Sequence, residues 1–343
     1  MSESSRPVLT DSPEENQAQP LAWHRRYRRH VMWGGLGIAL LLTVTLVGLY
    51  LWASSSYFEN IMRRRLIARI EAATGGRAEI GDFHWKMLKL EAEADGVVLH
   101  GREAQGEAPY AQLGSLHVAI DILGFWSPRI LLRDLELDRP QIHVIVYRDG
   151  STNQPQPRTK TESNPLGTLF DLQAGHVEVK HGVFDYEKRS DESDFQDRHI
   201  PLDFSANDVS LLLKYVATNG VTPESYHLDA GVRDLRLVRG PAGHPEAPPV
   251  EGYIEASVDL TRNAVYLRSL QLTAHSKGSA DRVLHVAGEL VDFNRPHWKT
   301  SVQGELDLKL MEPALGYPST PEGIAKLNLS LHKEFPDKTF KVD

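Results

Sequence analysis

Short stretches in which apolar and polar residues alternate recur along most of this chain. In residues 116–122 the sequence LHVAIDI places four apolar residues on one side of an extended strand: Leu116, Val118, Ile120 and Ile122. A period of two is typical of a β-strand with one dry face and one wetter face. The same alternation gives further dry-face positions at Leu135, Leu137, Ile142, Val144, Val146, Ile254, Val258, Leu284 and Val286. The pattern predicts a mainly β protein.

Turn residues separate these alternating stretches. Asp95-Gly96 and Asp149-Gly150 fall between or after them, and Pro140 and Pro296 are expected at strand edges. Close spacing of strands and turns predicts a meander, in which neighbouring strands run antiparallel. We therefore expect one long, curled antiparallel sheet.

One polar, proline-containing segment, residues 151–165, interrupts the strand pattern. It predicts a linker between a first β region, residues 54–150, and a continuing β region, residues 166–343. The sequence PLGTLFDL, residues 165–172, is expected to form a short helix before the strands resume.

The longest apolar stretch lies near the N-terminus. Residues 31–53 contain no charged side chain, and 23 residues at about 1.5 Å each span a hydrocarbon core of about 30 Å. This length exceeds the apolar region of a signal peptide, about 7 to 15 residues, so we expect an uncleaved transmembrane helix. Four arginines in HRRYRRH precede it, which favours a cytoplasmic tail over residues 1–30 and a single-pass topology with the bulk of the chain outside.

A second helical pattern follows at residues 60–73, where Ile61, Leu66, Ile67 and Ile70 recur near helical spacing. Gly75 and Gly76 are expected to end this helix. The pattern fits either an amphipathic helix at the membrane or at one end of a sheet, or a helix docked on the core.

Composition narrows the classes of function. A net charge of −8 argues against nucleic acid as a partner, because nucleic-acid-binding proteins are basic. Cysteine is absent and the 15 histidines form no compact ligand set, so we expect no disulfide, metal site or cofactor. Serine-nucleophile and phosphate-loop motifs are missing, so the chain is predicted not to be an enzyme and to have no catalytic residue.

The dry strand faces need a cover, and the two short helical patterns are too few to supply it. The sheet could close on itself as a sandwich or small barrel, or stay open as a groove that faces lipid. The 13 dry-face positions named above, Leu116 to Val286, are the candidate lining of such a groove.

Several segments resemble, in order, the N-terminal module of the AsmA-like family. They are the membrane helix, RRRLIARIEAATGGRAEIGDFHW, LEAEADGVVLHG, APYAQLGSLHVAIDILGFW and ILLRDLELDRPQIHVIVYRDGSTN, which together cover about residues 31–153. The last of these is the most specific: a strand ends in Arg-Pro, an alternating strand follows, and Asp-Gly precedes Asn153. Beyond residue 153 the similarity is limited to the strand rhythm.

The resemblance implies a protein of the bacterial inner membrane with a periplasmic β-groove. It further implies membrane phospholipids as the bound partner, in outer-membrane biogenesis, and a distant similarity to chorein-type bridge-like lipid transfer proteins. Bridging members are far longer, which leaves open a short member or a piece of a longer chain. The alternative is a membrane-tethered β-scaffold that binds outer-membrane or envelope-assembly proteins by strand addition.

Overall fold

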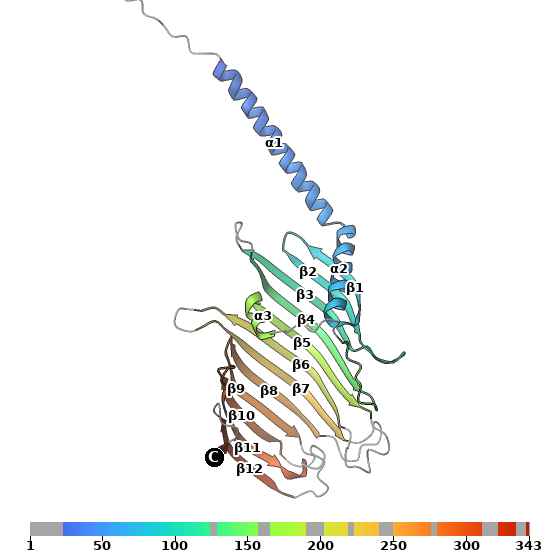
Figure 1. The fold of residues 1–343 in the computed structure, drawn as a ribbon, viewed down its shortest axis with the longest axis vertical. Helices are drawn as coiled ribbons and strands as arrows, with labels where there is room; N and C mark the ends of the chain where they lie inside the picture. The colour runs from blue at the N-terminus through green and yellow to red at the C-terminus, as the bar shows by residue number, and fades with distance from the viewer. Residues whose placement is uncertain are drawn as a thin grey trace, which may run out of the picture. The chain divides into compact units, whose positions relative to one another are not determined.

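A computed structural model describes residues 23–123, 129–156, 165–189, 202–218, 223–239, 250–275, 280–310, 322–333 and 341–342 (Figure 1). The helices are α1 (Trp23–Ala53), α2 (Ser56–Thr74) and α3 (Pro165–Leu172), with a 3-10 turn η2 (Leu308–Leu310). The strands are β1 (Arg77–Lys86), β2 (Glu91–His100), β3 (Ala111–Leu123), β4 (Arg129–Val146), β5 (His176–Lys188), β6 (Leu202–Val216), β7 (Ser225–Arg239), β8 (Val250–Thr261), β9 (Ala264–His275), β10 (Arg282–Val291), β11 (His297–Asp307), β12 (Ile324–Lys333) and β13 (Lys341–Val342).

The chain divides into two compact units, Met1–Ala53 and Ser54–Asp343. The first contains α1, whose segment Gly35–Ala53 is long and apolar enough to cross a membrane. Leu40, Leu46 and Leu51 are each more than 60% exposed, as expected for a helix that presents apolar side chains to lipid. The helix begins at Trp23, eight residues before the uncharged stretch that predicted it.

The second unit is built on a single sheet whose strands follow one another in chain order, β1 to β13 (Figure 1). The first and last strands do not pair with each other in the described residues, so the sheet is open. The prediction of a mainly β fold with one N-terminal helix apolar enough to cross a membrane and one short helix is confirmed. Of the two arrangements considered for the sheet, closed or open, the open one is found. The described strands form neither a closed barrel nor a second layer.

One pair breaks the predicted antiparallel meander. Strands β4 and β5 are parallel, whereas all other neighbouring pairs are antiparallel. Parallel neighbours need a crossover that returns the chain to the same end of the sheet. Residues 147–175, which include α3, form this crossover, so the sheet continues directly across the predicted linker. Thr152 bridges Val146 and Asn153 is fully buried, so the start of that linker is structured, and residues 157–164 lie outside the description.

The prediction that Pro140 ends a strand is wrong. β4 runs for 18 residues through Pro140, which pairs with Leu113 of β3. Just before it, Arg139 has a φ of 52°, in the left-handed region. The strand is therefore distorted at this point without ending, which is a position that proline tolerates.

Arg139 belongs to a row of irregular residues that crosses the first strands. Gly96, His181 and Asp208 in β2, β5 and β6 also have left-handed φ values of 63°, 52° and 49°. Apolar residues change phase at this row: in β4, for example, the odd-numbered Leu135 and Leu137 give way to even-numbered apolar positions. A residue in this conformation changes the face of the sheet to which the following side chains point.

The backbone of β1 provides an independent sign of this reversal. The N–H groups of Ala78 and Trp85 both point outward from the free edge of β1 and donate to carboxylates of α2. One of these residue numbers is even and the other is odd. In a regular strand, residues of opposite parity would point to opposite edges. We interpret the irregular residues Gly96, Arg139, His181 and Asp208 as backbone distortions that keep the apolar residues before and after them on one face of the sheet.

Helix α2 is docked along the free edge of β1. It begins after the N-cap Ser55 and ends at Gly75, whose φ of 77° and hydrogen bond to Glu71 confirm the predicted C-cap. Glu71 accepts a hydrogen bond from the Ala78 N–H at 3.1 Å, and Arg63 donates to the Gly81 carbonyl at 2.8 Å. Side chains of α2 thus satisfy the backbone groups that an edge strand leaves unpaired.

Candidate functional site

The strand register assembles one continuous apolar row across the sheet. Residues that pair directly across neighbouring strands lie on the same face. Starting from Phe83 in β1, successive partners are Ala94, Leu116, Leu137, Val179, Leu211, Ala230, Ala256, Leu270, Val286, Val302 and Leu329. Every strand from β1 to β12 contributes one residue and none is polar. At ~4.8 Å between strands, the row follows the sheet for about 50 Å.

Eight of the 13 predicted lining residues lie in or beside this row. Three belong to it: Leu116, Leu137 and Val286. The others pair on the same face: Val118 with Leu135, Ile254 with Leu272 and in turn Leu284, and Val258 with Leu267. Alternation within strands therefore selected residues that the register brings together.

The remaining five predicted residues occupy less uniform positions. Ile120 pairs with Leu132 beyond a bulge, and Ile122 pairs with Ile130, in a part of β3 whose side chains lie outside the description. Val144 is buried and Ile142 is 38% exposed, both beyond the row of irregular residues, and Val146 is half-buried. Alternation alone does not distinguish these environments.

Sequence reasoning missed several residues of the face. Phe83, Trp85, Val179, Leu211 and Val302 were not named, although GDFHW at 81–85 shows the same alternation in miniature. Cross-strand register, which one sequence does not reveal, is the signal that would have found them.

Helix α3 covers one part of the apolar face. Phe170 packs edge-on against Tyr226 with ring centroids 4.9 Å apart, and both side chains are fully buried with Leu213 and Ala174. The Tyr226 hydroxyl donates to the Leu169 carbonyl at 2.8 Å, and burial raises its pKa to about 12. This cluster is the main closed core of the sheet in the described residues.

A second part of the face forms a groove beneath α2. Its volume is about 400 Å³, and the lining combines helix and strand side chains: Phe58, Met62, Arg65, Leu66 and Arg69 from α2, with Phe83, Trp85, Ala92, Glu93, Ala94, Leu116 and Val118 from β1 to β3. The exposed wall of this groove is almost entirely apolar. It contains Leu116 and Val118, two of the predicted lining residues.

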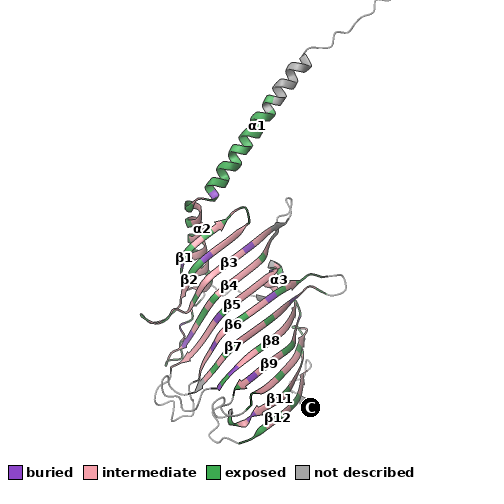
Figure 2. Cartoon of the chain, turned by 180° about the vertical axis from the view of Figure 1, so that it is seen from behind, coloured by how far each residue is buried: buried purple, intermediate pink, exposed green. Residues whose placement is uncertain are grey.

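Most residues of the strands are only half-buried, as the prevailing colour of the strands in Figure 2 shows. Leu329, at the far end of the row, is 38% exposed. In the described part of the chain only α2 and α3 lie against the face, and no second sheet covers it. The apolar row is therefore an accessible surface as well as a core.

No family model matches this chain, and no curated protein was found to resemble it in sequence. The AsmA-like resemblance thus depends on the sequence segments quoted above.

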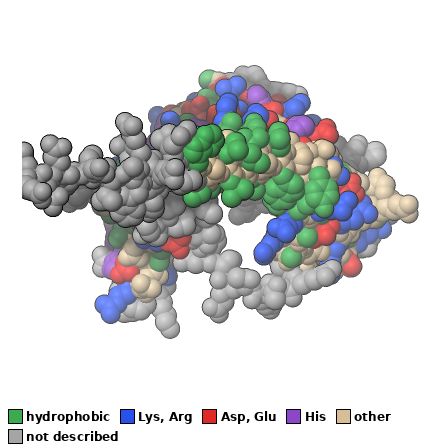
Figure 3. Space-filling model, turned by 90° about the horizontal axis from the view of Figure 1, so that it is seen from above, with side chains coloured by type: hydrophobic (Ala, Val, Ile, Leu, Met, Phe, Trp, Pro, Cys, Tyr) green, Lys and Arg blue, Asp and Glu red, His purple; other side chains and the backbone are tan. Residues whose placement is uncertain are grey.

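The opposite face is polar. In β1 to β5, the sequence neighbours of the apolar-row residues point to this opposite face and pair with one another across the strands. They are His84, Glu93, His117, Glu136 and Glu178. A hollow of about 820 Å³ lies over β5 to β9. Its lining combines polar residues such as Ser210, Glu255 and Gln271 with Ile254 and with Val179, Leu211, Ala230 and Ala256 of the apolar row. Acidic and basic side chains are interspersed over the described surface (Figure 3). No group of three potential metal ligands occurs among the described residues.

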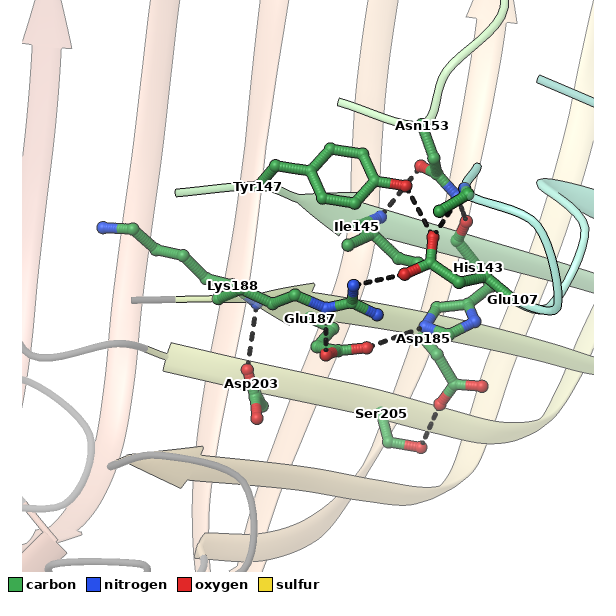
Figure 4. A network of polar contacts seen from close by, with 12 residues as sticks. Glu107, His143, Ile145, Tyr147, Asn153, Asp185, Glu187, Lys188, Asp203 and Ser205 are labelled. Atoms are coloured by element: carbon green, nitrogen blue, oxygen red, sulfur yellow. Dashed lines mark hydrogen bonds and ion pairs between the residues drawn. The ribbon is translucent and has the colours of Figure 1, made fainter. Parts of the chain in front are cut away.

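A polar network joins the loop after β2 to β4 and β5 (Figure 4). Glu107 pairs with Arg189 and accepts a hydrogen bond from Tyr147 at 2.7 Å. The hydrogen bond from Arg189, which has the larger effect, and the one from Tyr147 lower the pKa of Glu107 to about 2. His143 lies 3.5 Å from Glu187 on the same network. In the same network the Ser205 hydroxyl donates to the Asp185 carboxylate at 2.8 Å, and the Lys188 N–H donates to Asp203 at 3.0 Å. These contacts tie neighbouring strands together, as a structural clamp would.

Proposed function

We propose that this chain is a membrane-anchored protein that binds phospholipid acyl chains along the apolar face of its sheet. The observation that carries the proposal is the uninterrupted apolar row from Phe83 to Leu329. Burial of a methylene group in such a surface contributes about 0.8 kcal/mol, so an acyl chain laid along the row would gain several kcal/mol. Lipid head groups would remain in water, and the binding involves no covalent chemistry.

The proposed setting is the bacterial inner membrane, with a cytoplasmic N-terminus and the sheet in the periplasm. The arginines before α1 and the AsmA-like order of the first 153 residues support this orientation. Only Ser54 and Ser55 separate α1 from α2 in the sequence, so α2 and its groove follow the membrane helix directly in the chain. Transfer of lipid along the row would serve outer-membrane biogenesis.

A second candidate function follows from the edge at β12. Strand β13 pairs only with Leu331 and His332, so much of the outer edge of β12 has no strand partner among the described residues. An exposed edge can accept a strand from another protein. The second proposal is a membrane-tethered scaffold that recruits an outer-membrane or envelope-assembly protein by strand addition.

Site-specific photo-crosslinking in cells separates the two candidates. A photoreactive amino acid is placed at Val118 or Val286 on the apolar face, and at His285, the neighbour of Val286 that points to the opposite face. Lipid binding predicts phospholipid adducts at the first two positions and few at His285. Equal adducts at all three, or none at any, would refute lipid binding, whereas protein adducts from probes on β12 would favour the scaffold.

A further inference from the structure

Two arginines of α2 stand at the rim of the groove beneath that helix. Arg65 and Arg69 are four residues apart, so they lie on one helix face, and both line the groove although their side chains are exposed. Phe58, Met62 and Leu66 lie beside them and face the same space. The groove thus combines an apolar floor with a doubly positive rim.

The charge of this rim is not balanced by the described residues. No ion pair or hydrogen bond joins Arg65 or Arg69 to a carboxylate in the described part of the chain, whereas Arg63 is bound to the Gly81 carbonyl. Glu93 also borders the groove, but its side chain belongs to the polar face of the sheet, where its carboxylate is paired with Lys86 at 2.6 Å. Hydrogen bonding from Lys86 lowers the pKa of Glu93, so it stays ionised in that pair.

Other arginines of the sheet show that partners are usual here. Arg133 contacts Glu91, Asp121 and Asp134, and Arg262 contacts Asp171 and Glu224. Arg65 and Arg69 are therefore distinguished by two features together, a place at an apolar groove and the lack of an anionic partner in the described residues.

We infer that Arg65 and Arg69 select glycerophospholipid of net negative charge at this groove while the acyl chains lie on Leu116 and Val118. The arginines bind the lipid phosphate, and they favour a phosphate that no cationic group of the same head group neutralises. Guanidinium groups bind phosphate oxygens through paired, charge-assisted hydrogen bonds. An amphiphile with one negative head and apolar tails matches a rim of two cations above an apolar floor. The inference rests on the proposed function and adds to it the head-group class of the lipid.

The test uses the full chain in neutral detergent micelles and two photoactivatable lipids that share the same acyl chains. One is phosphatidylglycerol, with net negative charge, and the other is phosphatidylcholine, which is neutral overall. Intact-protein mass spectrometry measures the labelled fraction. The wild type should label more strongly with phosphatidylglycerol. Arg65→Gln/Arg69→Gln should lower that preference about thirtyfold, because about 1 kcal/mol per arginine near an anionic head group amounts to about 2 kcal/mol for the pair.

Two matched variants make the result specific. Arg64→Gln removes a neighbouring exposed arginine of α2 that does not line the groove, so it should leave the preference unchanged. Arg65→Lys/Arg69→Lys keeps the charge and should retain most of it.

Each contrary outcome has a separate meaning. An unchanged lipid preference in the double glutamine variant would overturn this inference and leave the proposed function standing. An equal loss of both lipids in that variant would also overturn it, because the arginines would then not distinguish a head group of net negative charge from a neutral one. No labelling of the wild type by either lipid would overturn the proposed function as well.

Discussion

The side-chain amide of Asn153 takes the place of a strand partner for Ile145. Its Oδ1 accepts a hydrogen bond from the Ile145 N–H at 2.9 Å, and its Nδ2 donates to the His143 carbonyl at 2.7 Å. Ile145 and Asn153 are both fully buried. The ladder between β3 and β4 ends at the pair Ala111 and Ile142, so the amide continues the bonding of β4 where β3 no longer reaches.

Replacement of Asn153 by alanine should destabilise the sheet strongly. It leaves the buried Ile145 N–H and the partly buried His143 carbonyl without this partner. At about 1–3 kcal/mol for each unsatisfied group, we expect a loss of about 2–6 kcal/mol in the free energy of unfolding. Denaturant unfolding of the full chain in detergent, followed by tryptophan fluorescence, measures it. Asn207→Ala removes a solvent-exposed amide contact with Asp234 and should cost far less. Equal losses in the two variants would contradict the role given to Asn153.

The pairing of Glu107 predicts acid sensitivity. Its pKa is about 2 in the folded protein, below the ordinary value of 4.5, so the pairing stabilises the fold above about pH 4.5, and this contribution disappears as the pH falls toward 2. Glu107→Gln should therefore lower the melting temperature at pH 7 and have little effect near pH 2.

Thermal unfolding across this pH range checks the prediction. Glu255→Gln is a suitable control, because Glu255 is exposed and no ion pair is found for it in the described residues. A gap between wild type and Glu107→Gln that stayed constant from pH 7 to pH 2 would show that the carboxylate charge is not the cause.

The left-handed backbone at Gly96 can be tested by substitution at that position alone. Gly96 has a φ of 63°, and an added Cβ would meet only the Gly81 Cα, at 4.0 Å. Gly96→Ala should cost about 1–2 kcal/mol through backbone strain and not through a clash. Gly96→Asn should cost less, because asparagine tolerates this conformation better. Equal stability of the alanine variant and the wild type would mean that the strand can relax there.

The core beneath α3 should depend on Phe170. Phe170→Ala removes a fully buried ring from its contact with Tyr226 and should cost about 3–5 kcal/mol. Tyr226→Phe keeps the ring and loses the hydrogen bond to the Leu169 carbonyl, so its expected cost is about 1 kcal/mol. Calorimetry of the two variants compares these values, and a reversed order would show that α3 is held by the hydrogen bond and not by packing.

The sequence predicted those features that depend on local pattern. Alternation identified the strands, the uncharged stretch identified α1, and Gly75 marked the end of α2. The sequence pattern gave a wrong strand boundary at Pro140. The alternation of apolar residues changes phase there, and such a change along a single sequence resembles the end of one strand and the start of another. The phase change marks a distortion at Arg139 inside one long strand.

The sequence did not predict features that depend on contacts between segments distant in the chain. The parallel pair of β4 and β5 depends on where α3 returns the chain to the sheet. Asn153 was noticed only within a resemblance, since its function depends on where β3 ends. Leu116 and Val118 were identified by alternation, but the groove they line also needs Phe58 and Met62 of α2, which only docking brings close.

The docking of α2 makes the two borders of the sheet unequal. Glu59, Arg63 and Glu71 already occupy outward backbone groups of β1 that an incoming strand would require. At the other border, β13 engages β12 at only two residue pairs. An added strand can therefore join the sheet at β12 but not at β1, and each such strand would lengthen the apolar row by about 4.8 Å.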